Sequence, residues 1–293
     1  MNVELAFMEE MQRHGLDPSE IPCADGEFHR IHDRQDKPGK IDLWYVLHDN
    51  GLPVGIFGHW SRLPETRKWH PKLISSLTPE ARLLIKKLYE QKRVTQELAK
   101  QQLQAECRTR SAMIHKAADE ANPCHTYLTK KHVKPYGIKQ LNDKLIIPLY
   151  KCGILTGLQI ITPDGKKRFL KHTEKAGAYF SIPGCTNTIC IAEGYATAAT
   201  IHELTGNGAV VAFDCWNLKA VAIAFKATHP DNKIIICADN DRLTTGNPGL
   251  TKAREAALAI GAKLAIPTFP GDEGTDFNDL FAICGAGGTP CLL

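Results

Sequence analysis

Four carboxylates stand where short apolar segments end. Glu193 follows TICIA, Asp239 and Asp241 follow IIICA, and Asp276 lies in TDFND. If these segments are parallel strands, their carboxyl ends meet at one edge of a sheet, where ligands bind. Anions gathered there repel one another unless a hard cation lies between them, and oxygen ligands suit Mg²⁺ or Mn²⁺. The pattern therefore predicts a divalent-metal site for phosphoryl transfer.

Other acidic residues follow apolar segments singly. Asp214 comes after VVAF, and Asp279 closes TDFND. A single acidic residue after a strand usually caps a helix or forms a turn, and this is our interpretation of both. Asp239 and Asp241 differ, because side chains two apart in an extended segment point the same way. We expect this pair to share a cation with Glu193 or Asp276.

Basic residues close to these segments are candidates for binding nucleotide phosphates or a template backbone. A Pro-Asp-Gly turn at 163–165 leads directly into KKRF, and one arginine follows the Asp-x-Asp pair. The candidates are Lys144, Lys166, Lys167, Arg168 and Arg242. Any single lysine is more often a solvated surface charge. Arg168 is favoured, because two lysines and an aromatic residue flank it.

Aromatic residues concentrate near the N-terminus of the chain. Trp60 and Trp69 are candidates for stacking single-stranded bases, each stack contributing about 1–3 kcal/mol. Aromatic residues on strands of a small domain more often build its core, and we favour that for Trp44 and Tyr45. The histidines of this region lack the fixed spacing of a zinc site, so a metal there is a minor alternative.

The elements that must position these residues fall into four predicted regions. Residues 1–76 form a small strand-rich domain with a hairpin turn at Asn50-Gly51, and residues 77–122 form one long helix or two collinear helices, capped by Thr78. Residues 123–186 form a basic, strand-rich subdomain. In residues 187–293 apolar strands alternate with helices, which predicts a parallel sheet covered on both faces. The fold class is therefore α/β, or α+β overall.

Composition excludes several classes of protein. The chain has 293 residues, a net charge of +4 and ten cysteines. No two cysteines form a C-x-x-C pair, so we expect no zinc, and reduced thiols fit a cytoplasmic protein. No stretch approaches the roughly 20 apolar residues of a membrane span. A polyanionic partner is permitted by the charge but not required.

A family resemblance rests on three ordered motifs. IAEGYATAATI, then ADND, then TDFND resemble the Toprim domain shared by bacterial DnaG-type primases, topoisomerases and some nucleases. Together with VVAFD, they are most similar to primases encoded by phages, plasmids and other mobile elements, over residues 123–285. The resemblance implies that Glu193, Asp239 and Asp241 are catalytic, that these three and Asp276 bind two metal ions, and that residues 123–185 face template and nucleotide.

The resemblance also implies an activity. A DNA-directed RNA polymerase of this type makes short primers on single-stranded DNA from ribonucleoside triphosphates. A zinc ribbon and a Walker motif have no counterpart in this sequence, so we expect a separate helicase or replication protein as partner. Two alternatives stay open. One is a metal-dependent Toprim nuclease, and the other is a non-catalytic DNA-binding replication accessory.

Overall fold

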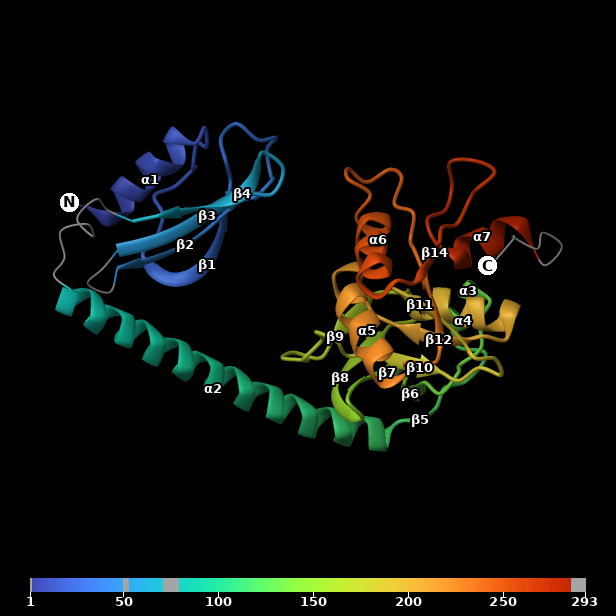
Figure 1. Ribbon diagram of the computed structural model, residues 1–293. Coiled ribbons are helices and arrows are strands. Elements are labelled where there is room, and N and C mark those ends of the chain that lie inside the picture. The colour runs from blue at the N-terminus through green and yellow to red at the C-terminus, as the bar shows by residue number, and fades with distance from the viewer. Residues whose placement is uncertain (1, 50–52, 71–78, 286–293) are drawn as a thin grey trace. The chain divides into compact units, whose positions relative to one another are not determined.

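The computed structural model describes residues 2–49, 53–70 and 79–285. The chain divides into two compact units, Met1–Gln96 and Glu97–Leu293 (Figure 1). Each unit has its own sheet or sheets and its own hydrophobic core. The finer division into four domains remains a prediction.

The first unit is a four-stranded antiparallel sheet with a helix on one face. Helix α1 (Val3–Arg13) precedes the strands, which pair in chain order. The strands are β1 (Asp25–Ile31), β2 (Leu43–Asp49), β3 (Pro53–His59) and β4 (Leu63–Trp69). The antiparallel β2–β3 pairing confirms the predicted hairpin, whereas its predicted Asn50-Gly51 turn lies outside the described residues.

Aromatic packing holds α1 on this sheet. The Phe7 ring meets Tyr45, Phe57 and Trp69 edge-on, with ring centroids 5.3–5.9 Å apart. A Cβ at Gly55 would fall 2.3 Å from the Phe7 ring, so glycine is needed where α1 approaches β3. Trp69 is only 8% exposed. The predicted stacking of bases on Trp69 is therefore wrong, because its ring is part of the core.

A single helix, α2 (Pro79–Ala117), follows. Its 39 residues settle the choice between one helix and two. The predicted N-cap, Thr78, lies outside the described residues. Near the end of α2, Cys107 is buried, with its Sγ 4.0 Å from the carbonyl oxygen of Thr156. The last turns of this helix thus belong to the second unit.

The second unit contains two five-stranded sheets. The first is antiparallel and runs in chain order: β5 (Asp119–Glu120), β6 (Lys139–Leu141), β7 (Lys144–Lys151), β8 (Ile154–Ile161) and β9 (Lys167–Phe169). The second has the order β10-β12-β11-β13-β14, from β10 (Phe180–Ile182), β12 (Gly208–Val211), β11 (Thr188–Ala192), β13 (Lys233–Cys237) and β14 (Lys263–Ala265). Strands β11 to β14 are parallel, and β10 is antiparallel to β12.

Helices cover both faces of the parallel sheet, as the alternation of strands and helices predicted (Figure 1). On one face, α4 (Tyr195–Thr205) and α7 (Phe277–Cys284) share a core with Cys190, Ala192 and Val211. On the other, α5 (Cys215–Thr228) and α6 (Pro248–Ile260) pack on Ile191, Val210 and Ile236. Residues on successive positions of one strand thus enter opposite cores, which accounts for their nearly continuous apolar sequence.

The antiparallel sheet joins the first of these cores. Leu145, Ile147 and Ile161 pack in the same cluster as α4. A short helix, α3 (Thr126–Lys131), lies in the segment for which only strands were predicted. Among the described helices, none combines the length and the apolar character that a membrane crossing requires.

Candidate active site

The four predicted carboxylates lie at the carboxyl ends of the parallel strands. Glu193 links β11 to α4, and Asp239 and Asp241 follow β13, which pairs directly with β11. Asp276 is the N-cap of α7, and its Oδ2 accepts a hydrogen bond of 2.9 Å from Thr197 Oγ1 on α4. Adjacent strands and two joined helices therefore bring the carboxylates to one edge of the sheet.

The surroundings of Glu193 disfavour its ionised form. Burial and the nearby charges of Asp241 and Asp214 raise its pKa to about 7. The ammonium of Lys167 opposes this rise. Its Oε1 atom is buried and has no hydrogen-bond partner among the described residues. A buried carboxylate oxygen without a donor loses its hydration with no compensation, so it favours a proton or a cation.

The surroundings of Asp239 likewise disfavour its ionised form. Burial, followed by the charges of Glu193 and Asp276, raises its pKa well above the usual range. Its Oδ1 atom is likewise buried without a donor in the described part of the chain. Two orphaned carboxylate oxygens on neighbouring strands fit a hard divalent cation, whose charge would remove the mutual repulsion.

Asp241 and Asp276 each accept a hydrogen bond from a backbone amide. Asp241 Oδ2 accepts from the amide of Gly249 at 3.1 Å, near the start of α6. Asp276 Oδ1 accepts from the amide of Asp279 at 2.8 Å, as a helix cap does. Across residues 2–49, 53–70 and 79–285, no three His, Cys, Asp or Glu side chains converge as ligands of one ion. The expectation that Asp239 and Asp241 share a cation with Glu193 or Asp276 stays a prediction.

Gly249 explains how the Asp-x-Asp loop folds against α6. A Cβ there would lie 2.7 Å from the Asp239 carbonyl oxygen and 2.8 Å from Asp241 Oδ2. Contacts that short do not occur, so any side chain would push the loop away from the helix. The close approach lets the amide of Gly249 donate to Asp241 and fixes the direction of that carboxylate.

Lys167 is the basic candidate that reaches the carboxylates. Burial lowers the pKa of its ammonium, while the charges of Asp276, Asp239 and Glu193 act to raise it. The residue as a whole keeps exposed surface, so part of its side chain contacts solvent. A Cβ at Gly194 would be 3.3 Å from Lys167 Nζ, which places this ammonium directly over the Glu193–Gly194 turn.

The other basic candidates lie elsewhere. Lys144 and Arg168 are exposed, on β7 and β9. Lys166 forms an ion pair with Asp164 in the preceding turn, with 2.8 Å between Nζ and Oδ2. The preference for Arg168 over its neighbours is not supported, because Lys167 is the residue of this group that acts on the carboxylates.

Arg242 makes structural contacts, and its nucleotide-binding role stays a prediction. Its guanidinium donates to the carbonyl oxygens of Gly271, Glu273 and Gly274 at 3.0–3.3 Å. It also lies over the Phe269 ring, 4.8 Å from the centroid. These contacts tie the Asp-x-Asp loop to the segment before α7, so Arg242 supports the loop that carries Asp239 and Asp241.

Helix α3 contributes residues that sequence reasoning did not single out. The Tyr127 hydroxyl is buried with no hydrogen-bond partner among the described residues, and burial together with the charge of Asp276 raises its pKa. Lys131 pairs with Asp279, with 3.2 Å between Nζ and Oδ1. A tyrosine in a segment that was expected to form strands gives no sequence signal of a position beside an acidic site.

Asn278 and Asp214 organise the surroundings. Asn278 Nδ2 donates to the Lys131 carbonyl at 2.6 Å and to Thr200 Oγ1 at 2.9 Å, which joins α7 to α3 and α4. Asp214 caps α5 through the amide of Asn217 at 2.9 Å and pairs with Lys175 at 3.0 Å. The interpretation of Asp214 as a helix cap is thus confirmed. Asp279 accepts from the amide of Thr275 in the turn before α7.

A surface cavity lies at the opposite edge of the same sheet. It is lined by Thr188, Lys233 and Lys263, the first residues of β11, β13 and β14, and none of the four carboxylates borders it. Because ligands of open parallel sheets bind at the carboxyl ends of the strands, we place the active site at the carboxylate edge and not in this cavity.

Comparison with known proteins agrees with the motifs. Residues 188–287 match the Toprim domain family model. Two proteins named DNA primase TraC from Escherichia coli are 35% identical over 275 residues and 33% identical over 299 residues. These alignments cover 87% and 94% of this chain. The chain spans only 25% and 20% of the length of these relatives.

Solved structures show weaker likeness. The DnaG catalytic core matches with a TM-score of 0.36 at 18% identity, covering 50% of each chain. The DnaG primase catalytic domain bound to single-stranded DNA matches with a TM-score of 0.39 at 16% identity, covering 66% of this chain and 77% of that one. The family match at residues 188–287 and the similarity to proteins named DNA primase agree with the resemblance drawn from the motifs.

Proposed function

We propose that the chain, with its Toprim domain at residues 188–287, is a DNA primase-like nucleotidyltransferase that makes short RNA primers on single-stranded DNA. The observation that carries the proposal is the pair of orphaned, buried oxygens, Glu193 Oε1 and Asp239 Oδ1, with the ammonium of Lys167 among the same charges. The relatives named as primases support the polymerising reaction in particular.

Each residue of the site has a proposed part in primer synthesis. Glu193, Asp239, Asp241 and Asp276 would hold two Mg²⁺ or Mn²⁺ ions, which supply charge stabilisation for phosphoryl transfer when bound. Glu193 also lies where its carboxylate would take up the proton that leaves the attacking 3′-hydroxyl. Lys167 would orient the triphosphate by pairing its ammonium with phosphate oxygens.

The exposed basic residues around this centre would serve the template. Lys144, Lys166 and Arg168 lie on the antiparallel sheet or the turn that precedes β9. Such charges supply sequence-independent attraction for a nucleic-acid backbone. We further propose that the chain acts in the cytoplasm, in replication of a mobile element, with a helicase or replication protein as partner.

Primer synthesis tests the proposal directly. The purified chain is incubated with Mg²⁺ or Mn²⁺, labelled ribonucleoside triphosphates and single-stranded DNA, and the products are separated by size. We expect short RNA from the wild-type chain and none from Asp239→Ala. Asp272→Ala, an exposed loop residue, is the matched control and should retain activity. Degradation of the template without synthesis would establish a nuclease instead, and binding without either reaction would establish a non-catalytic accessory.

A further inference from the structure

The sheet of the first unit has one face packed on α1 and a second face with exposed aromatic rings. Strand pairing defines that second face: Arg30 lies opposite Trp44, Phe28 opposite Val46, Val46 opposite Ile56, and Ile56 opposite Lys68. Trp60, directly after β3, adds its ring beside Trp44. We call this surface the aromatic face, and its residues are Phe28, Arg30, Trp44, Val46, Ile56, Trp60 and Lys68.

Exposure on the aromatic face is unusual for side chains of this size. Phe28 is 54% exposed, Ile56 36% and Trp60 64%. The core on the other face accounts for Tyr45, Phe57 and Trp69, so the fold does not need these rings for its interior. Contiguous exposed apolar surface of this kind marks a site for a partner.

The rings form a continuous row. Phe28 stacks on Trp44 with 5.7 Å between centroids, and Trp44 meets Trp60 at the same distance. Trp44 lies against the sheet, because a Cβ at Gly58 would fall 2.5 Å from its ring. Trp44 thus lies at the centre of the row, with the exposed rings of Phe28 and Trp60 on either side. The row offers successive ring faces for stacking rather than a pocket for one side chain.

The face carries cations beside its rings. Arg30 lies opposite Trp44 and Lys68 opposite Ile56, whereas carboxylates lie at the strand ends: Asp25 at the first position of β1, opposite His48, and Asp42 directly before β2, where it pairs with Lys40. Arg30 is held beside the row because its Nε donates to the Ile41 carbonyl at 3.1 Å. Aromatic rings with cations at their margins suit single-stranded nucleic acid, because bases stack on the rings while phosphates meet the cations.

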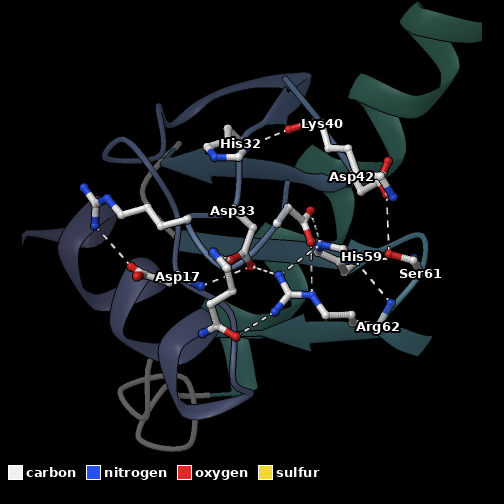
Figure 2. Close-up of polar contacts among 11 residues, drawn as sticks. Asp17, His32, Asp33, Lys40, Asp42, His59, Ser61 and Arg62 are labelled. Carbon is white, nitrogen blue, oxygen red and sulfur yellow. Dashed lines mark hydrogen bonds and ion pairs between the residues drawn. The ribbon is translucent and has the colours of Figure 1, made fainter. Parts of the chain in front are cut away.

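A buried polar cluster fixes the turn that carries Trp60 (Figure 2). The Asp33 side chain has no solvent exposure and pairs with Arg62, with 2.5 Å between Oδ2 and Nη2. His59 Nε2 is 2.9 Å from Asp36 Oδ2, and His59 Nδ1 accepts from the amide of Arg62 at 3.2 Å. The residues on both sides of Trp60 are thus anchored to segment 33–36.

We propose that the aromatic face is a second nucleic-acid site, which binds single-stranded DNA by stacking bases on Phe28, Trp44 and Trp60. Arg30 and Lys68 neutralise the phosphates beside the stacked bases. The site shares no residue with the carboxylate edge, so it binds without metal and without nucleotide. Such a site lets a primase bind its template away from the catalytic centre. This biological role rests on the proposed function.

The test measures binding by the whole chain in EDTA and without nucleotides. Fluorescence anisotropy follows a labelled oligothymidylate of about 20 nucleotides, longer than the range of about 4–16 nucleotides that one single-strand-binding fold covers. Phe28→Ala and Trp60→Ala should each weaken binding at least about fivefold, the low end of the loss for one base stack. Leu5→Ala, an exposed residue of α1, is the matched control and should leave the affinity unchanged.

A second strand separates stacking from charge. The wild-type chain should bind an abasic strand of equal length more weakly than oligothymidylate, and the Phe28→Ala, Trp60→Ala double variant should bind both strands alike. Wild-type affinity of the double variant for oligothymidylate would overturn the proposal. So would light scattering that shows a dimer broken by Trp60→Ala while DNA binding stays unchanged, because the face would then be an interface between two copies.

Failure of this site and failure of the proposed function give different results. Asp239→Ala should lose primer synthesis and still bind oligothymidylate with wild-type affinity. A wild-type chain that binds through the aromatic face yet makes no primers would keep this site and refute the primase. A chain that makes primers but binds equally well without the two rings would keep the primase and refute this site.

Discussion

Neutralising Glu193 should stabilise the metal-free protein while abolishing primer synthesis. The pKa of this carboxyl is raised from an ordinary value of 4.5 to about 7 in the folded chain. A raised carboxyl pKa is a penalty on folding, because the unfolded chain ionises at a lower pH than the folded one. The penalty is absent below pH 4.5, grows between pH 4.5 and 7, and is complete above pH 7.

The size of the effect follows from the same shift. At about 1.4 kcal/mol per pKa unit, the penalty has a ceiling of about 3 kcal/mol above pH 7. Glu193 is partly exposed, so solvent screening brings the expected gain for Glu193→Gln to about 1–2 kcal/mol. That gain corresponds to a few degrees in the unfolding temperature of a domain of this size.

Scanning calorimetry in EDTA at pH 8 and pH 4.5 measures the effect. Glu193→Gln should unfold at a higher temperature than wild type at pH 8 and at the same temperature at pH 4.5. Adding Mg²⁺ at pH 8 should stabilise wild type more than the variant, because cation binding relieves the same repulsion. Glu273→Gln, an exposed loop residue, is the control. A Glu193→Gln variant no more stable than wild type at pH 8 would refute the reasoning.

Three further substitutions probe the elements around the carboxylates. Lys167→Met removes the cation among the carboxylates, so it should lower primer synthesis at least about tenfold and lower the metal-free unfolding temperature. Lys166→Met, the control, should change the primer yield on a gel little. Gly249→Ala should destabilise the second unit by about 1–3 kcal/mol in urea titration, because its Cβ meets the Asp-x-Asp loop, while Gly271→Ala, with open space, should be neutral. Arg242→Ala should speed amide exchange in the loop before α7 without changing the affinity for oligothymidylate in EDTA. Equal effects in a variant and its control, or faster exchange confined to other loops, would contradict these assignments.

Much of the second unit was predictable because its signals are local and repeated. Continuous Ile, Val and Ala segments predicted parallel strands with two covered faces, and Ile191 and Cys190 do enter opposite cores. A carboxylate after such a strand must lie at the carboxyl edge, whatever the details of the loop. The position of Glu193 and Asp239 at one edge could therefore be predicted from spacing alone.

The ligand geometry could not be predicted, because it depends on competing hydrogen bonds. Asp276 is drawn to the start of α7 and to Thr197, and Asp241 is drawn to the amide of Gly249. The Asp276–Thr197 contact joins residues far apart in sequence, and the Asp241–Gly249 contact depends on a close approach that only glycine permits. Spacing shows which carboxylates meet, whereas these contacts decide where each oxygen points.

The choice among the three basic residues at 166–168 shows the same limit. On β9, Lys167 lies opposite the buried Ile161 and Arg168 opposite Ile160. Ile161 belongs to the core shared with α4, and Phe169, two residues on from Lys167, meets Phe213 of that side edge-on. Lys167 and Phe169 thus point toward the Toprim sheet, and Arg168 points away. Shifting the register by one residue would exchange their faces, so the residue that reaches the carboxylates is decided by strand pairing and not by charge or by neighbours in sequence.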